Sequence, residues 1–220
     1  MVLQIFRGRP VKAMSENIKT LRQEFGPLLR LAIPLVLAEL GWMGMGIVDT
    51  MMVGRLPDSA EAIGAVSIGT VAHYTVMFFG MGLLLGLDTL VSQAFGAGKV
   101  KDCHLSLMSS LYLILAISPV LMGIILAGIP LLPTLGIHPD VLHWAIPYLK
   151  ALNWGVFPLL LYFAFRRYLQ GMNLVHPVLF ALITANLVNV AANWVLIFGH
   201  LGFPAMGVEG SGWATTISRT

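Results

Sequence analysis

The sequence predicts an all-α fold, a polytopic membrane helix bundle with five complete transmembrane helices and a truncated sixth. Three observations lead to this prediction. The 220 residues are 57% hydrophobic and only 10% charged, and their mean hydropathy is +0.84. Soluble domains carry about 25% charged residues, so this chain has too few charges to cover a surface that faces water. The apolar residues form long runs, and most basic residues lie in short segments between those runs.

Five apolar runs are long enough to cross a bilayer, which requires about 20 residues. They are residues 28–54, 64–94, 105–133, 143–168 and 177–199. A sixth run begins near Gly207 and is cut off at Thr220. Pro34, Pro119 and Pro158 fall inside predicted spans, where each removes a backbone hydrogen bond and can kink its helix. Glycines inside the spans let helix backbones approach closely; they are Gly41, Gly44, Gly46, Gly80, Gly82 and Gly86.

The distribution of basic residues predicts the orientation of the bundle. One side receives the arm 1–27 with five basic residues, Lys99 and Lys101, and the span end near Arg166 and Arg167. The loops on the other side contain a single basic residue, Arg55. Cytoplasmic loops carry the excess of Lys and Arg, so we expect a multi-pass protein of the plasma (inner) membrane with its N-terminus in the cytoplasm.

The chain divides into a cytoplasmic arm, residues 1–27, and a transmembrane bundle, residues 28–220. Apolar residues recur at helical spacing near the end of the arm. This spacing predicts a short amphipathic helix over residues 15–27 at the membrane surface, with a flexible arm as the alternative. Aromatic residues near predicted span ends fit the aromatic belt at a membrane interface; they are Trp144, Tyr148 and Tyr168.

Ionisable groups inside a membrane are costly and usually indicate a functional site. The first span contains two acids, Glu39 and Asp49. Ten residues separate them, which places them about 15 Å apart along the helix and about 80° apart around it. We interpret Asp49 as a proton or cation site that lines a cavity, with a structural hydrogen bond as the alternative. Glu39 is the weaker candidate, because a neighbouring helix can hold a mid-span carboxyl neutral.

The fifth span carries three asparagines, Asn186, Asn189 and Asn193, on one helical face. Amides that face lipid would leave donors and acceptors unpaired, so this stripe must face protein or water. It lines a cavity or joins helices by hydrogen bonds. Asp88, near the cytoplasmic end of the second span, fits an interfacial or packing role better than a functional one.

Several classes of function are disfavoured by the sequence. No basic stripe with interleaved aromatic residues suggests nucleic-acid binding. Walker A and H-E-x-x-H motifs are absent, so neither an ATP-driven pump nor a zinc hydrolase is supported. Among the histidines, only His73 lies inside a predicted span, so an intramembrane enzyme is disfavoured. We expect no enzyme activity and no cofactor beyond a coupling ion.

Several ordered motifs resemble the multidrug and toxic compound extrusion (MATE) family. Residues 33–54, which contain Ile33-Pro34 and Val48-Asp49-Thr50-Met51-Met52-Val53-Gly54, look like its first helix. Residues 88–98 look like the end of its second helix, and residues 169–171 like the end of its fourth. Residues 186–193 and 207–216 are similar to its fifth and sixth helices.

The resemblance implies twelve helices in two lobes and export of organic cations or drugs in exchange for H⁺ or Na⁺. This chain would then be most of the N-terminal lobe, and its partners would be a small organic cation, membrane lipids and a C-terminal lobe. The resemblance assigns the H⁺ or Na⁺ site to Asp49, helix bending to Pro34, and cavity-lining roles to Asn189, Asn193 and Thr215. Some members carry Asp at the position of Asn193, so schemes that need two such carboxylates do not transfer directly.

Two further functions stay open. A lipid-linked saccharide flippase of the same superfamily would carry an anionic cargo, and its cavity should be basic. The predicted spans contain acids and amides, while Arg166 and Arg167 lie at a cytoplasmic end. A non-catalytic membrane scaffold would have no need for Asp49 inside the membrane.

Overall fold

The computed structural model describes residues 11–220, in which no strand occurs. The elements are α1 (Val11–Val53), α2 (Ser59–Gly96), α3 (Val100–Gly128), the 3₁₀ helix η1 (Ile129–Leu135), α4 (Pro139–Trp154), α5 (Val156–Gly171), α6 (Val175–Phe198) and α7 (Gly207–Ser218). Four of the helical stretches are long and apolar enough to span a membrane, and the bent pair α4–α5 makes a fifth. The helical, multi-pass architecture predicted from the sequence is therefore confirmed.

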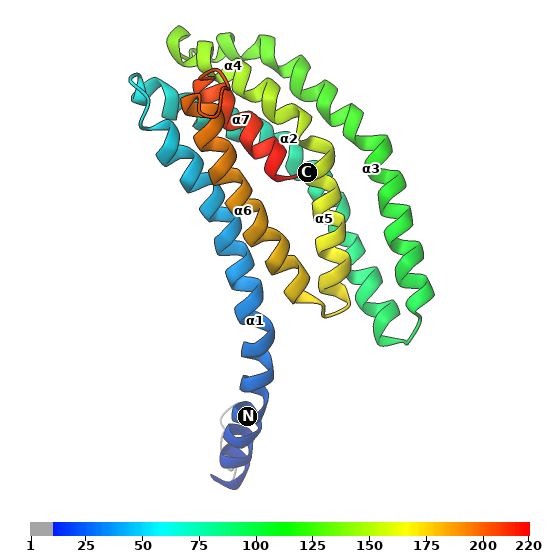
Figure 1. The fold of residues 1–220 in the computed structure, drawn as a ribbon. Coiled ribbons are helices and arrows are strands. Elements are labelled where there is room, and N and C mark those ends of the chain that lie inside the picture. Colours follow the sequence, from blue (N-terminus) through cyan, green and yellow to red (C-terminus); the bar gives the residue numbers. More distant parts are fainter. Residues whose placement is uncertain (1–10) are drawn as a thin grey trace, which may run out of the picture.

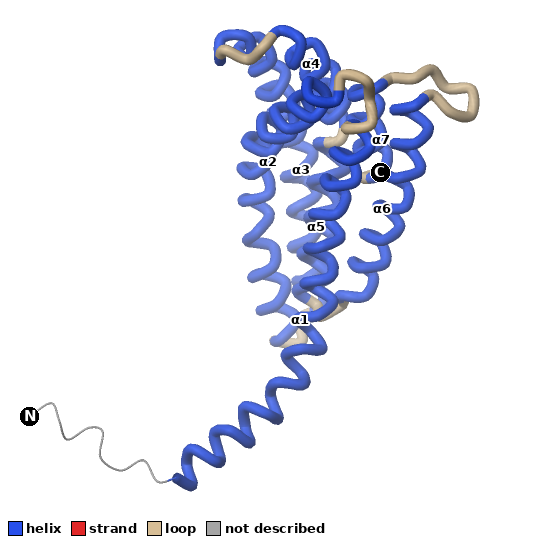
Figure 2. The backbone as a smooth tube through the Cα atoms, turned by 90° about the vertical axis from the view of Figure 1, so that its left-hand side faces the viewer, coloured by secondary structure: helices blue, strands red, loops and turns tan. Residues whose placement is uncertain are grey.

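Helix α1 is longer than the span predicted from hydropathy. It begins at Val11 and continues without a break through Pro34 to Val53. The arm is thus helical from Val11, and the N-terminal part of α1 projects away from the other helices (Figures 1 and 2). The first ten residues lie outside the described part of the chain. An interfacial position for residues 15–27 remains a prediction.

The predicted fourth span, 143–168, is not one straight helix. It consists of α4 and α5, which meet at Gly155 with a bend of 50°. Pro158 lies three residues beyond Gly155 and has no N–H, so the carbonyl of Trp154 loses its helical partner at this point. The kink predicted for Pro158 is thus present, but the bend lies at Gly155, about one helical turn before the proline. Pro119, by contrast, lies within the unbroken α3.

The helices form an antiparallel bundle in which loops alternate between the two ends. The α2–α3 and α5–α6 connections lie at one end, and the α1–α2 and α6–α7 connections lie at the other (Figure 1). Helix α1 packs on α6, helix α7 packs between α6 and α4, and α2 contacts α3, α4 and α5. The short α7 thereby reaches the centre of the bundle, where it meets the C-terminal part of α1 and the second half of α4.

The bundle buries a core between α2, α3, α4 and α5 and leaves much apolar surface uncovered. Met77, Ile114, Leu121 and Leu160 are almost fully buried in this core. Many large apolar side chains remain exposed; Phe79, for example, is 64% exposed. Apolar surface of this extent requires lipid or further helices as its neighbour.

The glycines reveal where helices pack most tightly. An added Cβ at Gly41 or Gly80 would contact a leucine side chain at 2.8 or 2.7 Å, which agrees with the predicted close approach. Gly44, Gly46, Gly82 and Gly86 instead have nothing within 4 Å among the described residues. At these four, the described helices do not approach closely. Between helices, the closest backbone approaches occur at Gly210 and Gly212 of α7.

Candidate functional site

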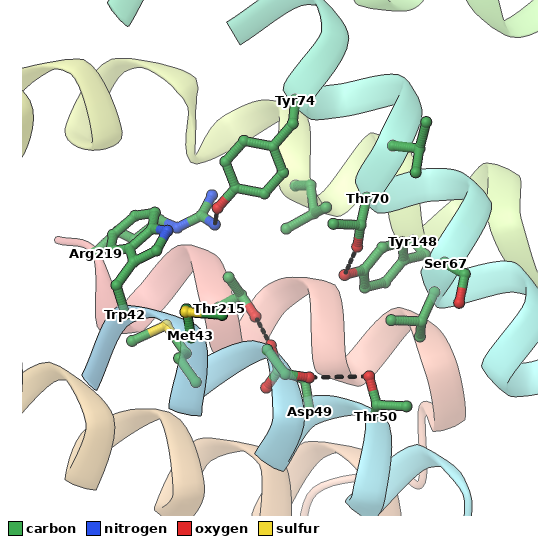
Figure 3. Close-up of a pocket in the computed structure, with 15 residues that line it drawn as sticks. Trp42, Met43, Asp49, Thr50, Ser67, Thr70, Tyr74, Tyr148, Thr215 and Arg219 are labelled. Carbon is green, nitrogen blue, oxygen red and sulfur yellow. Dashed lines mark hydrogen bonds between the residues drawn. The ribbon is translucent and has the colours of Figure 1, made fainter. Parts of the chain in front are cut away.

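A cavity of about 450 Å³ lies between α1, α2, α4 and α7. Asp49 and Thr50 line it from α1, Thr70 and Tyr74 from α2, and Tyr148 from α4; Thr215 of α7 and Arg219, which follows α7, complete the polar lining (Figure 3). Most of the remaining wall is apolar. The cavity therefore combines one buried carboxyl group with aromatic and hydroxyl side chains, which is the composition expected of a small-molecule or ion site.

Asp49 is the centre of a buried hydrogen-bond network. Its side chain is 4% exposed and accepts hydrogen bonds from Asn193 Nδ2 at 2.5 Å and from Thr215 Oγ1 at 2.9 Å. Asn193 Nδ2 also donates to Asn189 Oδ1 at 3.1 Å, and Asn189 Nδ2 lies 3.5 Å from Thr215 Oγ1. The network thus joins three helices, α1, α6 and α7, around one carboxyl group.

Among the described side chains, no basic group lies within ion-pair distance of the Asp49 carboxyl. Its stabilisation comes instead from neutral donors. Asn193 Oδ1 is also buried and has no hydrogen-bond partner among the described residues. Oxygen atoms from Asp49, Asn193, Asn189 and Thr215 are the hard ligands that a proton or an alkali or alkaline-earth cation prefers. The arrangement is chemically suited to a site for H⁺ or Na⁺.

The structure brings together four of the residues predicted from the sequence and separates the others. Asp49, Asn189, Asn193 and Thr215 form the network. Asn186 is half-buried and donates to its own helix at Leu182 O, 2.9 Å away, so it does not reach Asp49.

Glu39 lies elsewhere on the lobe. Its side chain is 60% exposed and forms an ion pair with Arg166 of α5, whose side chain is only 4% exposed. Arg166 is therefore buried, although the sequence placed it at a span end. Pro34 is half-buried in the continuous α1, and its role in bending stays a prediction.

Several cavity residues were not found from the sequence. Tyr148 was assigned to the aromatic belt, but it is 3% exposed and its hydroxyl lies 3.1 Å from Thr70 Oγ1. Arg219 donates to Tyr74 Oη at 3.2 Å, and its guanidinium lies 5.8 Å from the ring centre of Trp42. A partial signal existed, because Trp42 and Asp49 are seven residues apart and so share one face of α1.

The hydroxyl of Thr215 is expected to stabilise the charged form of Asp49, to which it donates a hydrogen bond. Thr215→Val keeps the shape of the side chain but removes the donor to Asp49 and leaves the carboxyl with one donor fewer. Loss of a hydrogen bond to a charged group amounts to about 1.5–3 kcal/mol, so gradient-driven transport should fall about tenfold or more. The measurement is dye efflux from vesicles.

Thr184→Val is the matched control for this experiment. Thr184 is exposed on α6 and donates only to Phe180 O of its own helix. Its replacement should leave efflux unchanged. Equal efflux by the two variants would show that Thr215 does not support Asp49.

The fold and site define a class, a multi-pass membrane protein whose helices surround a buried, hydrogen-bonded carboxyl group. The family model described as MatE matches residues 34–195 of the chain. The chain belongs to the MATE family.

Curated relatives support this assignment over nearly the whole chain. The probable multidrug resistance protein NorM of Bradyrhizobium diazoefficiens is 36% identical over 210 residues, which are 96% of this chain and 44% of that protein. The multidrug resistance protein PmpM of Pseudomonas aeruginosa is 33% identical over 208 residues, 94% of this chain and 43% of that protein. The chain therefore spans less than half the length of the relatives that it matches.

Solved structures share the fold. A crystal structure of a MATE protein in complex with MaD3S has a TM-score of 0.71 and 22% identity, and the match covers 87% of this chain and 42% of that one. An outward-facing MATE multidrug resistance transporter matches with a TM-score of 0.69 and 21% identity, over 87% of this chain and 41% of that one. The helix arrangement described above is therefore that of one part of a MATE structure.

Proposed function

We propose that this chain is the N-terminal lobe of a secondary active transporter that exports organic cations or drugs in exchange for H⁺ or Na⁺. The observation that carries the proposal is Asp49, which is buried in a cavity and held only by neutral donors. A buried carboxyl of this kind changes charge when it takes up a proton or a cation. The relatives' names, which refer to multidrug resistance, favour drugs as the cargo.

The proposed mechanism couples the charge of Asp49 to the shape of the cavity. Ionised Asp49 attracts a cationic substrate into the cavity beside Tyr148 and Tyr74. Binding of H⁺ or Na⁺ at Asp49 then removes this attraction, and the ligands from Asn193 and Thr215 rearrange. Since these residues belong to α6 and α7, the change is transmitted from α1 to two neighbouring helices. Bending of α1 at Pro34 and rocking against a second six-helix lobe would release the substrate.

In this proposal the protein lies in the plasma (inner) membrane with its N-terminus in the cytoplasm. The end of the bundle that carries Lys99 and Lys101 also carries the N-terminal arm, and basic loops favour the cytoplasmic side. The lobe would need a C-terminal lobe and surrounding lipid as partners.

The test is efflux of a fluorescent cationic dye from vesicles that contain a two-lobe transporter with this lobe. The concentration of H⁺ or of Na⁺ is set higher outside the vesicles than inside, with each ion tested in a separate experiment. Dye export driven by one of the two gradients supports antiport and identifies the coupling ion. Export of no cation on either gradient would contradict the proposal.

One observation keeps the lipid-linked saccharide flippase as a second candidate. The sequence indicated that basic residues stay at the cytoplasmic end, but Arg219 lines the cavity and Arg166 is buried within the bundle. An anionic cargo would use such groups. In the same vesicles, movement of a fluorescent lipid-linked saccharide without dye export would favour this candidate.

A further inference from the structure

A second pocket, of about 260 Å³, opens between α1, α2 and α5. It lies away from Asp49, toward the end of the bundle formed by the α5–α6 turn. Its polar lining consists of Glu39, Arg166 and Arg167. The rest of its wall is apolar, from Phe78, Met81, Gly82, Leu85 and Phe163.

The charges of this pocket are not balanced. Glu39 pairs with Arg166, and Arg167 has no ion-pair partner among the side chains that the structure describes. Two guanidinium groups therefore face one carboxylate. In addition, the Nε atoms of both arginines are buried and have no hydrogen-bond partner among the described residues. Unpaired donors in a low-dielectric site favour an anionic acceptor.

The position of the pocket along the bundle restricts what that anion is. Arg167 lies four residues before the end of α5 at Gly171, which corresponds to about 6 Å along the helix axis. Arginine side chains tend to extend toward the nearer membrane surface, which would bring the Arg167 guanidinium to the depth of lipid headgroups. Phe78 and Leu85, which line the pocket, are exposed apolar side chains that an acyl chain could contact.

We propose that this pocket binds an anionic phospholipid. Its phosphate would be held by Arg167 and the buried edge of Arg166, and an acyl chain would lie along Phe78 and Leu85. Guanidinium groups bind phosphate with two parallel hydrogen bonds, and basic pockets between transmembrane helices are known to bind anionic headgroups. This inference also bears on the proposed function: if the lobe exports cations, a bound phosphate would neutralise the positive charge of Arg166 and Arg167, which otherwise repels a cationic substrate.

Lipid retention tests this inference without any transport measurement. The transporter that carries this lobe is purified from nanodiscs with dioleoyl phosphatidylglycerol or dioleoyl phosphatidylcholine, and bound lipid is counted by native mass spectrometry. We expect retention of phosphatidylglycerol and not of phosphatidylcholine. Arg167→Gln should reduce this retention about tenfold, because one charge-assisted pair with phosphate is lost. Arg167→Lys should retain more lipid than Arg167→Gln, because lysine keeps the positive charge and loses only the pair of parallel hydrogen bonds that a guanidinium makes to phosphate.

Two further variants separate the charge of this pocket from charge elsewhere on the lobe. Glu39→Gln removes the opposing carboxylate and should increase retention of phosphatidylglycerol. Arg55→Gln, which removes an exposed positive charge in the α1–α2 loop at the opposite end, should have no effect. Melting temperatures measured alongside identify variants that have lost their fold.

Three outcomes would overturn the inference. Equal retention of both lipids would show that charge does not select the occupant. Unchanged retention in Arg167→Gln, with the melting temperature preserved, would place the lipid elsewhere. Full displacement of phosphatidylglycerol by excess inorganic phosphate would assign the pocket to a free anion instead of a lipid. None of these results depends on whether the protein transports cations.

Discussion

Gradient-driven dye efflux is expected to fall to the background of empty vesicles when Asp49 is replaced by Asn. The variant keeps a side chain that accepts from Thr215, but it can no longer become charged. It therefore loses the charge change to which substrate release is coupled in our proposal. We expect dye binding to persist in a weakened form, because the aromatic part of the cavity wall is unchanged.

The fold of this variant should survive. An amide at position 49 meets the amide of Asn193, and Asn193 can turn its unpaired Oδ1 toward the new donor. The change in the free energy of unfolding should then stay within about 1–2 kcal/mol, the size of one rearranged hydrogen bond. A melting curve of the purified protein checks this.

Asp88→Asn is the matched control for Asp49→Asn. Asp88 is a half-buried acid near the C-terminal end of α2, and it does not line the cavity described above. Its replacement should leave coupled efflux intact. If Asp49→Asn also exported dye normally, the buried carboxyl would be structural and the coupling group would lie in the other lobe.

The largest loss of stability is expected for Gly210→Ala. A Cβ at Gly210 would lie 2.6 Å from the carbonyl oxygen of Leu196 and 3.0 Å from the backbone nitrogen of Ile197. Both atoms belong to the backbone of α6, so relief requires α7 to move away from α6. Overpacking of this kind destabilises by about 1–3 kcal/mol or more. The melting temperature should fall by several degrees, since about 1 kcal/mol corresponds to roughly 2–4 °C in a domain of this size.

The same displacement should reduce transport, because α7 carries Thr215, which donates to Asp49 at 2.9 Å. Gly123→Ala is the control, since a Cβ at Gly123 of α3 has nothing within 4 Å. That variant should melt at or slightly above the wild-type temperature, because alanine favours the helix. Equal melting temperatures for the two variants would mean that α6 and α7 are not packed as closely as described.

The sequence by itself determined the membrane class and most of the span boundaries. Long apolar runs identify α2, α3 and α6, and the alternation of basic segments agrees with loops that lie at alternate ends of the bundle. It also identified Asp49, Asn189 and Asn193 as candidates, because polar groups in an apolar run have few acceptable positions. These inferences use composition and helical periodicity, which are properties of neighbouring residues.

Only the tertiary structure decided which candidates meet. Asn193 reaches Asp49 across 144 positions of sequence, while Asn186, on the same helix, bonds to its own backbone. Glu39 was placed in the first span correctly, but its partner Arg166 is 127 positions away. Tyr148 lines the cavity beside Thr70 of α2, and not the interface to which it was assigned. Helices in lipid associate through side-chain packing and hydrogen bonds between distant segments, and such contacts leave no periodic signal in the chain.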